Sequence, residues 1–206
     1  MTDGDQSLSR IEDVAEYWDQ RYGARLWPSE PDTILVSLAS ELMAGTALDL
    51  GCGTGRNSVW LASMGWSVQG VDISQVGLSQ ASRISVDAGV TLSFLRADIL
   101  EFEPEPGLYD LVVLANLHFP QSSAHELFAR VQTAVAIGGH LFVIGRHSDS
   151  ARTAEECALN RFYSEERLES LFPAMEVLEI GRVPGRGGYP SKDVDKVYLW
   201  ARRSDS

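Results

Sequence analysis

The stretch "LDLGCGTGRN", residues 48–57, places three glycines in five positions directly after an apolar and acidic run. Glycine loses more backbone entropy on folding than any other residue, so such a cluster indicates a backbone that bends sharply or lies close to a ligand. The apolar run over 46–50 predicts a strand, and residues 57–64 predict a helix. A glycine loop between a strand and a helix N-terminus predicts a ligand site at the carboxyl end of the strand.

Strand and helix patterns alternate along most of the chain after this loop. Strands are predicted over 46–50, 67–71, 91–96, 109–115 and 141–145, with helices over 57–64, 74–87 and 124–135. This alternation predicts a parallel sheet covered by helices on both faces. Residues 175–183 and 196–202 also alternate like strands and are expected to pair antiparallel at one edge. The predicted fold class is α/β: a three-layer, doubly wound, Rossmann-like fold with a mostly parallel seven-stranded sheet and an antiparallel last strand.

The length and composition limit the organisation and the partners of the chain. Its 206 residues suit one domain spanning 1–206, with a core over 46–146 and a helix and edge hairpin over 147–206. The formal net charge of −12 disfavours a nucleic-acid partner and leaves a small molecule as the expected substrate. No apolar run reaches membrane-span length, the N-terminus is polar, and the two cysteines fit a reducing compartment, so we expect a cytoplasmic protein without membrane contact.

The spacing of the glycines distinguishes between two classes of cofactor. A dinucleotide site is typically G-x-G-x-x-G, but Arg56 stands where its last glycine would be. The loop instead reads D-x-G-x-G-x-G from Asp49, and "GVDIS" places Asp72 at the end of the next strand. These two motifs, with "RADIL" (96–100), "YDLVVLANLHF" (109–119) and "GGHLFVIG" (138–145), resemble those of the class I S-adenosylmethionine-dependent methyltransferases.

That resemblance implies a cofactor and the residues that bind it. S-adenosylmethionine would be bound, and S-adenosylhomocysteine released, with Asp72 on the ribose hydroxyls, Asp98 on the adenine amino group and the Ile99 N–H on the adenine ring. Asp49 is placed to attract the cofactor's amino group, and the Gly51 backbone to accept a hydrogen bond from it. The full predicted cofactor-binding set is Asp49, Gly51, Cys52, Gly53, Gly55, Asn57, Asp72, Ile73, Asp98, Ile99, Ala115 and Trp27.

The N-terminal region narrows the resemblance further. "YWDQRYG" and "LWPSEP", together with the glycine loop, are similar to the tellurite-resistance and thiopurine methyltransferase group. Membership of that group implies that residues 1–42 form a helical lid and that Trp27 lies against the cofactor. We expect Trp18, Tyr22 and Trp27 to close over the site and exclude water.

The sequence places candidate acceptor-side residues after the fourth and fifth strands. Asn116 and His118 follow the fourth strand, and His147 follows the fifth, where a near-neutral histidine could accept a proton. The spacing of the four histidines predicts no metal site. The resulting prediction is methyl transfer to a small-molecule acceptor by in-line displacement, performed by a monomer or homodimer. The alternatives are a non-catalytic relative that binds the cofactor and, with less support, an NAD-dependent oxidoreductase.

Overall fold

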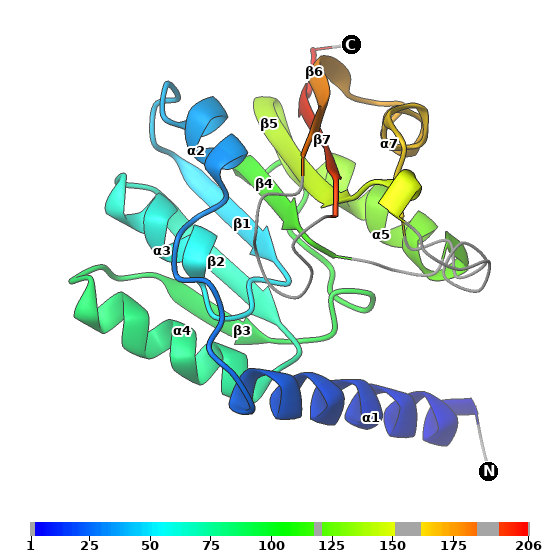
Figure 1. The fold of residues 1–206 in the computed structure, drawn as a ribbon. Helices are drawn as coiled ribbons and strands as arrows, with labels where there is room; N and C mark the ends of the chain where they lie inside the picture. The colour runs from blue at the N-terminus through cyan, green and yellow to red at the C-terminus, as the bar shows by residue number, and fades with distance from the viewer. Residues whose placement is uncertain (1–2, 118–120, 151–161, 185–193, 206) are drawn as a thin grey trace.

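A single seven-stranded sheet forms the centre of the computed structural model, which describes residues 3–117, 121–150, 162–184 and 194–205 (Figure 1). The strand order is β3-β2-β1-β4-β5-β7-β6. The pairs from β3 to β5 are parallel, whereas β7 runs antiparallel to both β5 and β6. The predicted sheet and its antiparallel last strand are therefore confirmed. The bounds are β1 (Thr46–Leu50), β2 (Ser67–Asp72), β3 (Ser93–Arg96), β4 (Tyr109–Ala115), β5 (Val135–Arg146), β6 (Glu176–Val183) and β7 (Lys196–Arg202).

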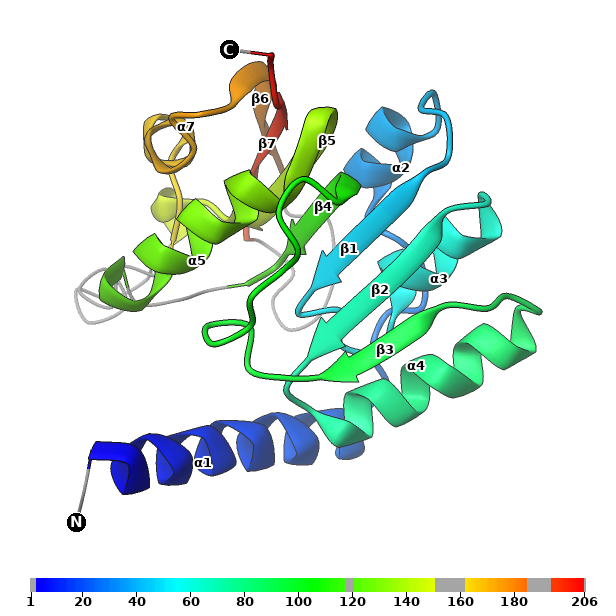
Figure 2. The ribbon, with the colours of Figure 1, turned by 180° about the vertical axis from the view of Figure 1, so that it is seen from behind.

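Helices cover both faces of the sheet and bury two apolar clusters (Figures 1 and 2). On one face, Leu35 and Leu61 pack with Phe142 of β5. On the other face, Phe128 and Phe172 pack against each other with ring centroids 5.2 Å apart. The helices are α1 (Asp3–Gly23), α2 (Thr33–Ala39), α3 (Arg56–Ser63), α4 (Gln75–Asp87), α5 (Gln121–Ala134) and α7 (Glu165–Leu171), with a short 3-10 turn η1 (Ser148–Ser150).

Side-chain caps fix where three of these helices begin. Asp32 accepts a hydrogen bond from the Ile34 N–H at the start of α2, and Ser74 accepts one from the Gly77 N–H at the start of α4. Ser164 caps α7 in the same way by accepting from the Arg167 N–H. Because the caps of α2 and α4 lie at the edge where the parallel strands end, they also fix the position of loops at that edge.

One strand extends beyond the residues that periodicity predicts. β5 begins at Val135 rather than at residue 141. Within the extension of β5, Gly138 has a φ of +79° and donates its N–H to the Arg203 carbonyl at 2.7 Å. The glycines at 138 and 139 thus form an irregularity inside a long strand instead of the connection that precedes it.

The sheet reverses its winding direction at β1, which pairs with β2 on one side and with β4 on the other. Open α/β sheets bind ligands outside the carboxyl ends of the strands at such a point. Figures 1 and 2 show α1 lying across this edge, and α1 packs against α4. The fold therefore brings the glycine loop and the N-terminal helix to the same edge.

Candidate functional site at the carboxyl edge of the sheet

The glycine loop between β1 and α3 is held against the end of β2. Gly51 and Cys52 both donate their N–H groups to the Val71 carbonyl, at 2.7 and 3.1 Å. Gly51, Gly53 and Gly55 have φ values of +67°, +55° and +79°, a left-handed conformation that residues with a Cβ adopt at a cost. The glycines are therefore needed for the path of the backbone.

Close packing also excludes side chains from this loop. A Cβ on Gly53 would lie 2.5 Å from the hydroxyl oxygen of Tyr22, and one on Gly55 would lie 2.8 Å from the Cβ of Ala81. A Cβ on Gly51 would overlap the side chain of Leu117. Tyr22 of α1 thus packs directly on the loop, so the N-terminal helix belongs to the site.

Asp49, the acid that precedes the loop, is buried at the end of β1. Its Oδ2 accepts a hydrogen bond from the Ser58 hydroxyl at 2.5 Å. The pKa of Asp49 is raised from its ordinary value of 3.8 to about 6. Burial is the main cause and the nearby charge of Asp72 adds to it, while Ser58 and Arg56 act in the opposite direction. A cation bound beside Asp49 would favour its charged form.

Asp72, at the end of β2, connects the glycine loop to the start of α4. Its Oδ2 accepts from the Gly53 N–H and its Oδ1 from the Ser74 N–H, both at 2.8 Å. Burial raises its pKa, as does the charge of Asp19, while the two N–H groups lower it. The carboxylate is consequently held in one orientation at the edge of the sheet.

The third predicted acid follows β3, the neighbour of β2. Asp98 is half-buried, and its Oδ1 accepts from the Leu100 N–H at 2.9 Å, while Ile99 is buried. Ile73 is half-buried after β2, and its carbonyl accepts from the Arg96 guanidinium at 3.1 Å. The structure thus places an acid at the end of each of three adjacent strands.

Four other residues of the predicted set differ in their surroundings. Asn57 is buried, and its Oδ1 accepts from the Asp32 N–H at 2.9 Å. Cys52 is buried beside the two acids, and burial raises the pKa of its thiol. Ala115 is half-buried at the end of β4. Trp27 donates its indole N–H to the Arg21 carbonyl at 3.2 Å. Their contact with a cofactor stays a prediction.

The aromatic residues of the predicted lid form one cluster. Trp18 stacks on Tyr22 with ring centroids 5.8 Å apart, and Tyr22 lies 4.9 Å from Trp27. Burial, together with the nearby acids, raises the pKa of the Tyr22 hydroxyl. The cluster therefore covers the glycine loop with apolar surface and a neutral hydroxyl.

The candidate acceptor-side residues lie at the ends of β4 and β5. Asn116 has a φ of +61° and donates its N–H to the Ile144 carbonyl at 2.7 Å. Asparagine tolerates this left-handed conformation better than most residues, and such conformations cluster at functional sites. His118 lies outside the described residues.

The ring of His147 is buried and both of its nitrogens are engaged. Nε2 lies 2.9 Å from Oε2 of Glu165, and Nδ1 accepts from the Asp149 N–H at 3.1 Å. These contacts connect the end of β5 with η1 and the first turn of α7. The histidine thus stabilises the connection between elements, and its role as a proton acceptor stays a prediction.

Sequence patterns gave no sign of Asp19, which joins α1 to the site. Its Oδ1 accepts from the Ser74 hydroxyl at 2.5 Å and from the Val76 N–H at 3.0 Å. The same Ser74 donates its N–H to Asp72. Asp19 stands between Trp18 and Gln20 on a helix rich in acids, so only the three-dimensional contact distinguishes it. Ser58, the partner of Asp49, was likewise not predicted.

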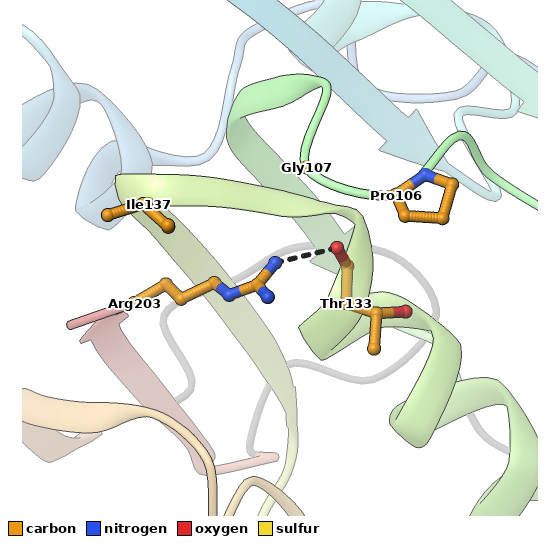
Figure 3. Close-up of a pocket in the computed structure, with 5 residues that line it drawn as sticks. All are labelled: Pro106, Gly107, Thr133, Ile137 and Arg203. Carbon is orange, nitrogen blue, oxygen red and sulfur yellow. Dashed lines mark hydrogen bonds between the residues drawn. The ribbon is translucent and has the colours of Figure 1, made fainter. Parts of the chain in front are cut away.

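A pocket lined by Pro106, Gly107, Thr133, Ile137 and Arg203 lies away from this site (Figure 3). It borders the beginnings of β4 and β5, at the edge opposite the glycine loop. Arg203 donates to the Thr133 carbonyl at 2.8 Å near the end of α5, where a cation is favourable. We interpret this arginine as a structural cap.

In the described part of the chain, no group of three or more histidine, cysteine, aspartate or glutamate side chains could hold a metal ion. None of the helices described has the length and apolar character needed to span a membrane.

The chain has relatives among curated proteins. Residues 47–139 match a family model described as "Methyltransferase domain". The ubiquinone biosynthesis O-methyltransferase of Paraburkholderia xenovorans is 34% identical over 152 residues, which cover 69% of this chain and 63% of the relative. The chain thus spans less than two thirds of the length of this relative.

Solved structures share the fold. TehB from Haemophilus influenzae has a TM-score of 0.73 at 16% identity, covering 91% of this chain and 67% of that one. The N-methyltransferase NodS from Bradyrhizobium japonicum, solved with S-adenosylhomocysteine, has a TM-score of 0.67 at 21% identity, covering 83% and 84%. At these identities the likeness concerns the fold.

The packing of Tyr22 on the loop predicts unequal costs for two glycine substitutions. In Gly89→Ala the alanine must adopt the φ of +68°, but nothing lies within 4 Å of the added Cβ. This backbone strain alone should cost about 1 kcal/mol of unfolding free energy. Gly53→Ala forces the same strain and displaces Tyr22, so its cost should exceed that of Gly89→Ala by at least about 1 kcal/mol. Urea unfolding measures both, and equal losses would contradict the packing.

The raised pKa of Asp49 predicts a pH-dependent gain from Asp49→Asn. The acid is largely protonated in both states only below about pH 3, and ionisation destabilises the fold progressively as the pH rises from there to about 6. The variant should therefore match the wild type near pH 3 and exceed its unfolding free energy above pH 6, by up to about 3 kcal/mol. Urea unfolding from pH 3 to 7.5 tests this, with the exposed Glu41→Gln as control. A less stable variant at pH 7.5 would rule it out.

Proposed function

We propose that the chain is an S-adenosylmethionine-dependent methyltransferase acting on a small molecule, because residues 47–139 match a family model described as "Methyltransferase domain". The observation that carries the proposal is the acid at the end of each of β1, β2 and β3 around a left-handed glycine loop. This set of hydrogen-bond acceptors suits a cofactor with net positive charge. A pyrophosphate would meet buried carboxylates instead of the cationic or N–H cradle that it needs.

Each part of the proposed cofactor site has a separate task. Asp72 would accept from the ribose hydroxyls while its hydrogen bonds to Gly53 and Ser74 hold it in place. Asp98 and the Ile99 N–H would bind the adenine. Asp49 would balance the positive charge of the amino group, and the Gly51 backbone would accept a hydrogen bond from it.

The bound cofactor supplies an activated methyl group with a good leaving group, so the protein mainly aligns the acceptor and excludes water. Asn116 would hold the acceptor from the end of β4, in a backbone conformation fixed by its hydrogen bond to Ile144. His118 and His147 stay candidate proton acceptors. A proton acceptor is needed for a hydroxyl or amine and not for an acidic thiol.

The accepting atom proposed first is oxygen. The curated relatives are named O-methyltransferases, and small hydroxyl compounds are therefore the first acceptors to test. Thiol and amine acceptors tested in the same assay would reveal transfer to sulfur or nitrogen instead.

We further propose that residues 1–42 act as the lid of the site. Tyr22 packs on Gly53, and Asp19 binds the cap of α4, so α1 is attached on both sides of Asp72. The lid would exclude water from the methyl group and hold the ribose-binding acid in place.

Calorimetric titration with S-adenosylhomocysteine tests the cofactor, with NAD as the competing ligand. We expect micromolar binding of S-adenosylhomocysteine, at least tenfold weaker in Asp72→Ala, and no binding of NAD. Preference for NAD would favour the oxidoreductase. Binding of S-adenosylhomocysteine without turnover of any hydroxyl, thiol or amine acceptor would favour the non-catalytic relative.

The lid contact predicts that Asp19→Ala weakens cofactor binding at a distance. The variant loses two hydrogen bonds to a carboxylate, which are together worth about 2–3 kcal/mol in the fold, and frees the Ser74 hydroxyl. We expect the Kd of S-adenosylhomocysteine to rise about fivefold or more by calorimetry. Asp13→Ala, an exposed acid on the same helix, is the matched control and should change it less than twofold. Equal effects of the two variants would contradict a lid that positions Asp72.

A further inference from the structure

The ends of β5 and β7 and the start of α3 bring cationic side chains together at the same edge of the sheet. Arg146 ends β5 and is paired in register with Lys196, the first residue of β7. Arg56 begins α3, directly after the glycine loop. The strands β5 and β7 lie on the side of β1 away from β2 and β3, and Arg56 meets Lys196 at Asp32. The proposed cofactor would occupy the ends of β1, β2 and β3. The acceptor must therefore approach from this side.

Arg56 and Lys196 share one buried carboxylate. Nη2 of Arg56 lies 3.8 Å and Nζ of Lys196 lies 3.7 Å from the same Oδ2 of Asp32, both beyond hydrogen-bond distance. The other oxygen of Asp32 already accepts from the Ile34 N–H as the cap of α2. The Arg56 guanidinium makes one further contact, of 3.4 Å, with the Glu30 carbonyl. Within the described residues, Asp32 is thus a carboxylate that two cations share at close range.

The surroundings of Lys196 make its charge costly. Its side chain is only 33% exposed. Burial lowers the pKa of Lys196, and the charges of Arg56 and Arg146 lower it further, against the opposing effect of Asp32. An anion bound here would offset both the burial and the repulsion. In a chain of net charge −12, a local positive surplus beside the site also provides a means of selecting a ligand by charge.

We propose that Lys196 and Arg56 form a subsite for an anionic group, a carboxylate or phosphate, on the methyl acceptor. The proposal rests on the proposed function, because the subsite would bind an acceptor whose reacting atom is aligned with the methyl group. Asp32 holds the two cations in place, and Asn57 fixes Asp32 through its backbone N–H. The acceptor's anion completes the charge balance on the exposed side of the pair. A neutral acceptor of the same shape would leave the surplus charge unmatched and bind more weakly.

The test compares a carboxylate with its neutral isostere by calorimetry, on protein with and without S-adenosylhomocysteine. The probes are 3,4-dihydroxybenzoate and 3,4-dihydroxybenzamide, and phenyl phosphate distinguishes phosphate from carboxylate preference. We expect the benzoate to bind at least about tenfold more tightly than the amide. Lys196→Gln should abolish that preference and Lys196→Arg should keep it. Arg56→Gln, a second neutralisation at the pair, should reduce it.

Arg202→Gln provides the matched control, since it removes the same charge from the opposite end of the same strand. It should leave the preference for the anion unchanged. Equal binding of benzoate and amide to the wild type, or a preference that survives Lys196→Gln, overturns the subsite. Titration of the same samples with S-adenosylhomocysteine reports separately on the proposed function. Lys196→Gln should alter that affinity less than twofold.

Discussion

The two hydrogen bonds that Asp72 accepts are the constraint on which the rest of the site depends. One carboxylate holds the Gly53 N–H of the first loop and the Ser74 N–H at the start of α4. Gly53 donates this hydrogen bond from a backbone with a positive φ. Tyr22 can pack on Gly53 because glycine has no side chain. A single buried charge therefore determines the arrangement of two loops, one helix start and the N-terminal helix.

The same arrangement requires burial of acids that a stable fold would otherwise avoid. Asp49 and Asp72 lose hydration at the end of adjacent strands, and burial is the largest cause of the raised pKa of each. Their hydrogen bonds recover only part of that cost. A positively charged ligand would recover more, so the acids would destabilise the free protein and favour the bound form. This balance is typical of functional sites, where stability and activity favour different residues.

Local patterns in the sequence predicted the parts of the structure that local interactions determine. The bounds of β1, β4 and β7, the cap of α7 and the loop acids follow from apolar runs, capping residues and glycine spacing. The contacts of Asp19 and Lys196 could not be predicted, because each joins segments more than 50 residues apart, α1 to α4 and β7 to the cap of α2. The early start of β5 depends on Arg203, which is distant in sequence as well.

Acids and cations are unevenly distributed about the switch point at β1. Asp49 and Asp72 lie among the last residues of β1 and β2, and Asp98 follows Arg96, the last residue of β3. On the other side, Arg146 ends β5 and Lys196 begins β7. Arg56 lies between the two sides, close enough to lower the pKa of Asp49 on one side and that of Lys196 on the other. A cation bound beside Asp49 and an anion bound beside Lys196 would therefore lie on different sides of β1, and electrostatics would help to orient the two ligands toward each other.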